Sequence, residues 1–353
     1  MLEEGRPALL SGRGSKPRNG RGNALRNAQN KNKNTSHASS TSNSLNLLRK
    51  KQAAISALLS DMGMEAVEQR LQDALESPPP GGGLAHAVAV ALDAATRRGA
   101  RGPALFVELP DSPPGAEGAA QTAELLIRAG VDGLVVPAAP LSGGEGVKVD
   151  DGTALARLVA AARAAAAAAA KDAPAKAAPS TITGGPPDLS GIPIPVLARD
   201  WIVHPLQLAE AKAAGAGGVL GASAAVLGRG ASILTAMGAA MGLDVPLEVV
   251  NRSELEAGAD GGTPLFAVNV SLGLSVAASI PGAAAALAAG ILEGLPPGAA
   301  ALVGVTTPAG AAAAAAAGAA GLVVKREYLL SAAVRGLGLA AAVEEARDAS
   351  SED

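Results

Sequence analysis

The chain contains no cysteine, and its 353 residues include only two Phe, one Trp and one Tyr. Without cysteine, disulfides, thiolate metal sites and thiol nucleophiles are excluded. With so few aromatic residues, a core must be built from Val, Leu, Ile and Ala, each of which buries little apolar area. Long apolar runs are also absent, because the alanine tracts Ala164–Ala170 and Ala311–Ala317 are far shorter than the ~20 residues of a membrane span. We therefore expect no membrane partner.

Basic residues are concentrated in the first part of the chain. Residues 1–51 contain eleven Lys and Arg against two Glu, a net charge of +9, so the rest must carry −12 to give the total of −3. From Ser11 to Asn46 no residue is acidic and no apolar periodicity could bury a face, which predicts a disordered leader over residues 1–46. An Arg- and Ser-rich leader of this kind is typical of an organelle transit peptide. We expect import into a plastid, to the chloroplast stroma, with the mitochondrion as the alternative.

Two other interpretations of this leader stay open. Arg- and Lys-rich disordered arms bind the phosphate backbone of nucleic acids, and a solvated tail can lack any function. No aromatic residue is interleaved in the leader for base stacking, which argues against a nucleic-acid partner.

An amphipathic pattern follows the leader. Apolar residues recur at helical spacing from Ser44 to Leu75, and a cluster of Pro and Gly over Ser77–Gly83 ends the pattern. Residues 47–83 are therefore predicted to form an N-terminal helix and a Pro/Gly linker. This helix is also our candidate docking element for a protein partner.

Eight short, nearly continuous apolar runs come next, separated by Ala-rich helical patterns. The predicted strands are Ala104–Leu109, Gly133–Pro137, Pro195–Arg199, Gly218–Ala222, Pro246–Val250, Leu265–Asn269, Ala301–Val305 and Gly321–Lys325. Such strands are covered on both faces and belong to parallel βαβ units, and eight units over ~250 residues are typical of a β/α barrel. An open doubly wound sheet would carry a Gly-rich phosphate loop after its first strand, and none is present. We predict an α/β fold, a (β/α)8 TIM barrel over residues 84–348 with a tail over 349–353.

In a β/α barrel the chemistry lies at the carboxyl ends of the strands. Glu108, Arg199 and Glu248 lie at or near three of these predicted ends. A carboxylate inside an apolar strand is costly to bury unless it is paired, so we favour a site role for the two glutamates over a structural one. Arg199 has a structural alternative, an inner salt bridge to one of them. Further polar residues near the strand ends are Ser112, Asn269, Thr306, Thr307, Lys325 and Arg326.

The segment around the third predicted strand resembles a known family. Pro195–Gln207, with the sequence PVLARDWIVHPLQ, resembles the Pro-Val-Leu-Arg-Lys-Asp-Phe-Ile-Ile-Asp-Pro-Tyr-Gln motif of indole-3-glycerol-phosphate synthase. Leu243–Val249 is similar to the family's fifth strand. The resemblance covers roughly Leu84 to Glu345.

That family closes an indole ring on 1-(2-carboxyphenylamino)-1-deoxyribulose 5-phosphate, with loss of carbon dioxide and water. The resemblance implies a lyase of tryptophan biosynthesis that takes a phosphorylated small-molecule ligand and needs no cofactor and no metal. It implies catalytic roles for Glu108, Arg199 and Glu248, with Arg199 at the position of the family's ring-closure lysine. By the same resemblance, the implied substrate-binding residues are Ser112, Asn269, Thr306, Thr307, Lys325 and Arg326.

The chain also departs from the family pattern. Pro110 stands where the family has a first-strand lysine, and Val305 stands where its seventh-strand motif has a glutamate. An arginine keeps its proton at every working pH, so Arg199 is a poor proton donor. Losing groups that act together costs several orders of magnitude in rate. We therefore expect impaired activity. Two alternatives stay open: a catalytically inactive barrel that binds an anionic ligand, and a structural subunit of an organellar assembly.

Overall fold

The computed structural model describes residues 48–79, 88, 102–110, 115–137, 160–161, 164, 194–268, 270 and 283–351. The chain divides into two compact units, Met1–Asn46 and Leu47–Asp353, and every described residue belongs to the second. The predicted leader and two candidate site residues, Ser112 and Asn269, lie outside the described residues. Disorder and import of the leader therefore stay predictions.

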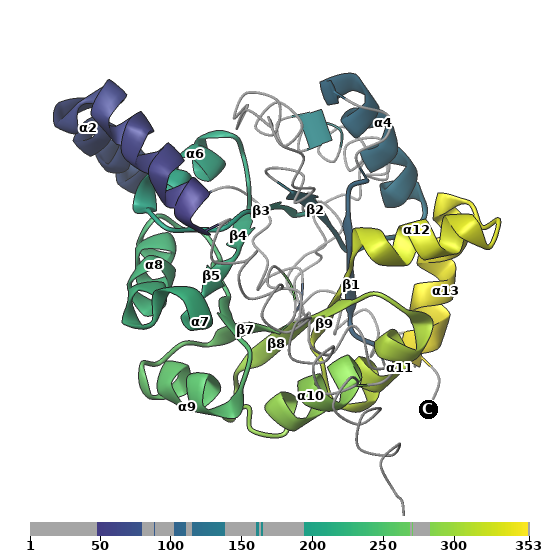
Figure 1. Ribbon diagram of the computed structural model, residues 1–353. Helices are drawn as coiled ribbons and strands as arrows, with labels where there is room; N and C mark the ends of the chain where they lie inside the picture. The colour runs from purple at the N-terminus through teal and green to yellow at the C-terminus, as the bar shows by residue number, and fades with distance from the viewer. Residues whose placement is uncertain are drawn as a thin grey trace, which may run out of the picture. The chain divides into compact units, whose positions relative to one another are not determined.

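Nine short strands form one parallel sheet in the order β4-β3-β2-β1-β9-β8-β7-β6-β5, and Figure 1 shows helices arranged around them. The strands are β1 Ala104–Glu108, β2 Gly133–Pro137, β3 Val196–Arg199, β4 Gly218–Leu220, β5 Ala222–Ser223, β6 Leu247–Val249, β7 Leu265–Val268, β8 Ala300–Val305 and β9 Gly321–Val324. The two end strands of this order, β4 and β5, are separated in the chain by Gly221 alone, so the chain itself joins the ends of the sheet into a ring. The predicted TIM barrel is confirmed.

The predicted fourth strand, Gly218–Ala222, is divided in the structure at Gly221. The φ angle of Gly221 is 115°, a region that glycine adopts freely and other residues rarely do. The part before Gly221 pairs with β3, and the part after it pairs with β6. The one predicted strand is thus two strands in the structure, and the bend between them allows pairing with β3 on one side and with β6 on the other.

Side chains alternate between the barrel interior and the surrounding helices. On β1, Phe106 belongs to an interior cluster, whereas Leu105 and Val107 pack in the layer between strands and helices. A Cβ atom added at Gly133 would lie 2.4 Å from the ring of Phe106, and one added at Gly321 would lie 3.1 Å from it. Glycines on the two neighbouring strands therefore make room for one of the few aromatic side chains.

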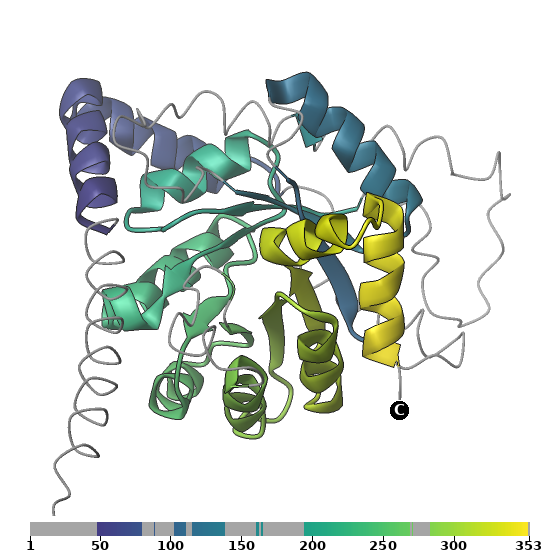
Figure 2. The same ribbon diagram turned by 45° about the vertical axis from the view of Figure 1, so that its right-hand side comes forward.

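Helices cover the outer face of the strands. They are α2 Met64–Glu76, α4 Gly115–Arg128, α6 Pro205–Ala213, α7 Ala224–Leu227, α8 Arg229–Ala240, α9 Arg252–Asp260, α10 Ala283–Leu292, α11 Pro308–Ala316, α12 Arg326–Val334 and α13 Leu339–Ser351. α13 packs against α4, α11 and α12 (Figures 1 and 2) and continues past residue 348, the predicted end of the barrel. Among the described helices, none combines the length and the apolar character of a membrane-spanning segment.

The N-terminal extension is interrupted where a single helix over Ser44–Leu75 was predicted. A helix over residues 48–62 ends at Gly63, and α2 begins directly after it. The φ angle of Gly63 is 75°, which favours glycine and turns the chain between the two helices. The apolar periodicity continues across the break, so the pattern alone did not reveal it.

Lys212 of α6 fixes this extension to the barrel. The side chain is buried, and its Nζ donates hydrogen bonds to the carbonyl oxygens of Ala74 at 2.7 Å, Ser77 at 2.8 Å and Met241 at 2.6 Å. These carbonyls lie at or near the ends of α2 and α8. Burial lowers the pKa of Lys212. Docking of a protein partner through the extension stays a prediction.

Candidate active site at the carboxyl ends of the strands

The parallel strands end at one rim of the barrel, and five polar side chains face inward there. They are Glu108 of β1, Arg199 of β3, Ser223 of β5, Glu248 of β6 and Lys325, which directly follows β9. The residue before each of them packs outward against the helices, so alternation along the strand turns the polar side chain inward. Two carboxylates, two cations and a hydroxyl therefore meet at the predicted place.

Glu108 and Arg199 form a buried ion pair. The Nε atom of Arg199 lies 3.0 Å from Oε1 of Glu108, and the two side chains are 10% and 1% exposed. Although the distance suits an ion pair, the N–H group is not aligned with Oε1 as a hydrogen bond requires, and neither atom has another hydrogen-bond partner in the described part of the chain. The structural alternative for Arg199, an inner salt bridge, is thus present in this state of the protein.

The second oxygen of Glu108 lies at the start of a helix. Oε2 accepts a hydrogen bond of 3.0 Å from the backbone N–H of Arg326, the first residue of α12. Helix N-termini carry unpaired N–H groups and a partial positive charge, so a carboxylate is stabilised there. Glu108 therefore contacts both the β3 cation and the amide after β9.

Glu248 is fully buried on the other side of the mouth. Its Oε1 accepts a hydrogen bond of 3.1 Å from the backbone N–H of Val270, beyond β7. Ser223 is the direct register partner of Glu248 on β5. Ser223 is 2% exposed, and its hydroxyl has no hydrogen-bond partner in the described residues.

Four buried side-chain atoms near this mouth lack a hydrogen-bond partner within the described ranges. They are Oε1 of Glu108, Nε of Arg199, Nε1 of Trp201 and Oγ of Ser223. Such groups are few in native proteins, and each suggests a bound water or ligand. Their gathering at the strand ends indicates a polar ligand site. No group of three or more His, Asp or Glu side chains suited to a metal ion is found in the same described residues.

Of the residues expected to bind a phosphate, some face the mouth of the barrel and others do not. Lys325 faces inward and is 6% exposed. Arg326 contributes its backbone N–H to Glu108. Thr307 is exposed, and its hydroxyl caps α11 by accepting a 3.1 Å hydrogen bond from Gly310 N–H, while Thr306 is partly buried beside it. Lys325 and Arg326 are therefore brought to the carboxylates, whereas the Thr307 side chain is engaged in local structure.

Val305 does not face the site. It packs in the outer layer, and the inward positions of β8 near the rim are Leu302, in the interior cluster, and Gly304. A carboxylate at position 305 would therefore point toward the helices in this register. The inward positions at the end of β8 still carry no acidic group.

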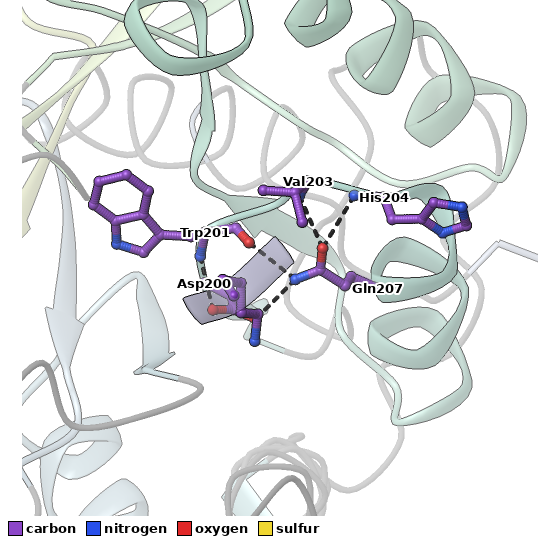
Figure 3. A network of polar contacts seen from close by, with 6 residues as sticks. Asp200, Trp201, Val203, His204 and Gln207 are labelled. Carbon is purple, nitrogen blue, oxygen red and sulfur yellow. Dashed lines mark hydrogen bonds and ion pairs between the residues drawn. The ribbon is translucent and has the colours of Figure 1, made fainter. Parts of the chain in front are cut away.

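The loop after Arg199 is held by a network of hydrogen bonds centred on the Gln207 carboxamide (Figure 3). Gln207 of α6 donates from Nε2 to Asp200 Oδ2 and to the Trp201 carbonyl oxygen, both at 3.0 Å. Its Oε1 accepts from the N–H groups of Val203 at 2.8 Å and His204 at 3.1 Å. The carboxamide is thus fully satisfied, and Figure 3 shows the indole ring of Trp201 turned away from it. This fixes the backbone next to Arg199.

Two more contacts complete the loop. Lys51, in the helix over residues 48–62, lies with Nζ 2.5 Å from Asp200 Oδ2, so the N-terminal extension reaches the rim of the barrel. His204 Nδ1 accepts a 3.1 Å hydrogen bond from Leu206 N–H and caps α6. Burial lowers the pKa of His204 below its ordinary value of 6.5, which favours the neutral ring that this acceptor role needs.

Comparison with known proteins supports part of the predicted relationship. No family model matches the chain. It is 40% identical over 80 residues to the indole-3-glycerol phosphate synthase of Azospirillum brasilense, which is 23% of this chain and 30% of that protein. It is 36% identical over 77 residues to that of Roseiflexus sp. (strain RS-1), 22% of this chain and 29% of that protein. This stretch resembles indole-3-glycerol phosphate synthase. The predicted resemblance is confirmed there, and the chain spans about 30% of the length of the curated relatives it matches.

Solved structures of low sequence identity also align with the chain. Tryptophan synthase subunit alpha from Legionella pneumophila str. Paris is 16% identical with a TM-score of 0.47, over 74% of this chain and 97% of that one. Tryptophan synthase from M. tuberculosis, in its aminoacrylate- and BRD0059-bound form, is 19% identical with a TM-score of 0.47, over 77% of this chain and 100% of that one. The assignment of the barrel rests on the pairing of its own strands.

Sequence reasoning missed two residues of this site. Ser223 lies one residue beyond the predicted fourth strand and is the last residue of β5, and its inward direction depends on the bend at Gly221. Trp201 was noted within the motif but not as a site residue, although it is the single Trp of the chain. A rare aromatic residue directly after a strand end was the signal available for it.

Proposed function

We propose that this chain is an indole-3-glycerol-phosphate synthase-like enzyme of tryptophan biosynthesis with a low rate of turnover. Its substrate would be 1-(2-carboxyphenylamino)-1-deoxyribulose 5-phosphate, and the products indole-3-glycerol phosphate, carbon dioxide and water. The observation that carries the proposal is the meeting of Glu108, Arg199 and Glu248 at one mouth of the barrel. The local sequence similarity to curated synthases supports it.

Each group has a role that its chemistry allows. The Arg199 guanidinium binds the oxygen of the substrate ketone and stabilises charge that develops there while the aryl carbon attacks. Glu108 and Glu248 move protons in the later loss of carbon dioxide and water. Lys325 and the N-terminus of α12 attract the phosphate.

The low rate follows from the groups that are present. A guanidinium does not release its proton at working pH, so Arg199 binds an oxyanion but donates poorly. Pro110 offers no cation, and the inward residues of β8, Leu302 and Gly304, offer no carboxylate. Groups of this kind act as one unit, and losing members of the unit costs orders of magnitude in rate.

A continuous assay of indole formation from the arylamino-deoxyribulose phosphate tests the proposal. We expect a slow rate above the uncatalysed one, reduced further in Glu248→Gln. Glu256→Gln is the matched control, because Glu256 is exposed on α9 and forms an ion pair with Arg252 one turn away. A wild-type rate equal to the uncatalysed rate would overturn the proposal.

A second function, binding of an anionic ligand without turnover, is favoured by one observation. Arg199 is already neutralised by Glu108, so the pair is arranged for charge balance more than for proton transfer. In that case the substrate binds the folded protein and no indole forms.

A further inference from the structure

The amide at the start of α12 already holds an anion from the protein itself. α12 has nine residues, and the N–H of its first residue, Arg326, donates to Oε2 of Glu108 at 3.0 Å. Helix N-termini bind phosphates and carboxylates in the same way, through N–H groups and the helix dipole. Glu108 is 1% exposed, so its carboxylate is enclosed at this position. An incoming anion therefore meets a competitor.

Glu108 does not satisfy all the hydrogen-bond donors of the two cations around it, Arg199 and Lys325. The Arg199 side chain is nine-tenths buried, and its Nε atom has no aligned hydrogen-bond acceptor in the described part of the chain. Lys325 is 6% exposed, and among the described residues its Nζ has no ion pair or hydrogen bond. It follows Val324, which pairs with Val107, so Lys325 and Glu108 are neighbours on adjacent strands. A single carboxylate thus faces two cations and a helix N-terminus, an arrangement that suits a dianion better.

We propose that Glu108 is a built-in competitor for the phosphate group of the ligand, and that phosphate binds at the start of α12 only when Glu108 leaves the Arg326 amide. The identity of the ligand as a phosphate ester rests on the proposed function, but the competition does not require turnover. Exchange of a monocarboxylate for a phosphate dianion adds acceptor oxygens for Arg199 Nε and Lys325 Nζ. In the barrel without ligand, the Glu108 carboxylate is the anion at the start of α12, and the phosphate must take its place there to bind.

Isothermal titration of the full-length protein with inorganic phosphate tests this competition. Glu108→Gln keeps the size of the side chain but removes the charge that competes for the amide, so we expect phosphate to bind about tenfold more tightly or better. Glu248→Gln is the matched control. It removes an equal charge from the same mouth, but the carboxylate of Glu248 accepts its hydrogen bond from the N–H of Val270, beyond β7, whereas that of Glu108 accepts from the first amide of α12.

The phosphate affinities of the two variants distinguish competition by Glu108 from a general effect of net charge. Tighter phosphate binding in Glu108→Gln than in Glu248→Gln supports the proposal. Equal gains in both variants would show an effect of net charge alone and overturn it, as would no gain in Glu108→Gln. If the Gln variant fails to fold, a crystal structure of the wild-type protein with phosphate decides: Glu108 turned away from Arg326 N–H supports the competition, and Glu108 still bound there, or no phosphate near α12, contradicts it. If the indole assay detects no activity, these binding results still test the competition, because none of them depends on turnover.

Discussion

Arg199 limits what the candidate site can do, because it supplies charge without a transferable proton. A lysine at the same strand end would offer an ammonium group that can both bind the ketone oxygen and protonate it. We predict that Arg199→Lys raises the rate of indole formation by about tenfold or more, since a placed general acid contributes ~100-fold in favourable cases. Initial rates at saturating substrate measure this.

Arg199→Gln is the control for the lysine variant. It removes the cation and should lower the rate, because the oxygen charge and the buried Glu108 both lose their partner. A lysine variant that is no faster than the wild-type protein would contradict proton donation as the limiting deficiency.

His204 gives the protein a specific pH dependence of stability. In the folded state its Nδ1 accepts from Leu206 N–H, and burial holds its pKa below 6.5. The unfolded chain therefore binds more protons between the two pKa values, so stability is fully present above the unfolded pKa and falls as the pH drops below it. We predict a lower free energy of unfolding at about pH 5 than at about pH 7.

Urea titrations at several pH values test this contribution. In His204→Asn the side-chain oxygen can still cap α6, but it does not titrate. The part of the pH dependence due to His204 should then be missing. Identical pH dependence in the two proteins would show that the imidazole is not linked to folding.

Among the elements, the contact of β2 with β1 depends on the glycine opposite Phe106. A Cβ at Gly133 would lie 2.4 Å from the Phe106 ring, which is fully buried and has little room to move. We predict that Gly133→Ala lowers the free energy of unfolding by about 1–3 kcal/mol, the usual cost of overpacking. Chemical denaturation followed by circular dichroism measures it.

A double variant shows whether the ring is the cause. Gly133→Ala with Phe106→Leu should be more stable than the sum of the two single effects predicts, because the smaller side chain relieves the clash. Gly290→Ala on α10 is the control: an added Cβ there has no neighbour within 4 Å, so the change should be neutral or stabilising. Additive effects in the double variant would rule out the proposed clash.

The join between the N-terminal extension and the barrel depends on the Lys212 ammonium. Its three carbonyl acceptors lie on two other parts of the chain, so Lys212→Met leaves buried helix-end carbonyls without a donor. We predict a loss of about 2 kcal/mol in the free energy of unfolding. Lys50→Met, at an exposed position of the helix over residues 48–62, should change it little. An unchanged stability of Lys212→Met would mean that desolvation of the ammonium offsets its hydrogen bonds.

The positions of the strands were predictable because each is a short aliphatic run, and the runs are separated by Ala-rich helical patterns. The bends were not. A glycine inside an apolar run, such as Gly221, or inside a helical pattern, such as Gly63, does not reveal its φ angle, which depends on where the neighbouring elements lie. The inward direction of Ser223 and the outward direction of Val305 follow from these bends and from strand register. Sequence therefore predicted which residues reach the rim better than which way they face.

At the scale of the whole barrel, the site is made of residues that only the closed ring brings together. Glu108 and Arg326 are 218 positions apart in the chain, yet their hydrogen bond joins the end of the first strand to the first turn of α12, which follows the last strand. Side chains of β1, β3, β5 and β6 also take part, and β4 and β5 close the ring through one glycine. No local pattern contains such a contact. It follows that opening the barrel at any strand removes the site.

Ligand binding at this mouth should consequently stabilise the entire barrel. A ligand that binds only the folded state raises the free energy of unfolding by about 2.7 kcal/mol at a concentration of ~100 times its Kd. We predict that 1-(2-carboxyphenylamino)-1-deoxyribulose 5-phosphate raises the melting temperature progressively with concentration. It should also change the fluorescence of Trp201, the single Trp, whose buried Nε1 has no hydrogen-bond partner within the described residues. The same compound without its phosphate should do so only at much higher concentration, because Lys325 and the start of α12 then have no dianion to bind. An unchanged melting temperature with both compounds would argue against a synthase and against an anionic-ligand binder alike, and would leave the barrel as a structural subunit.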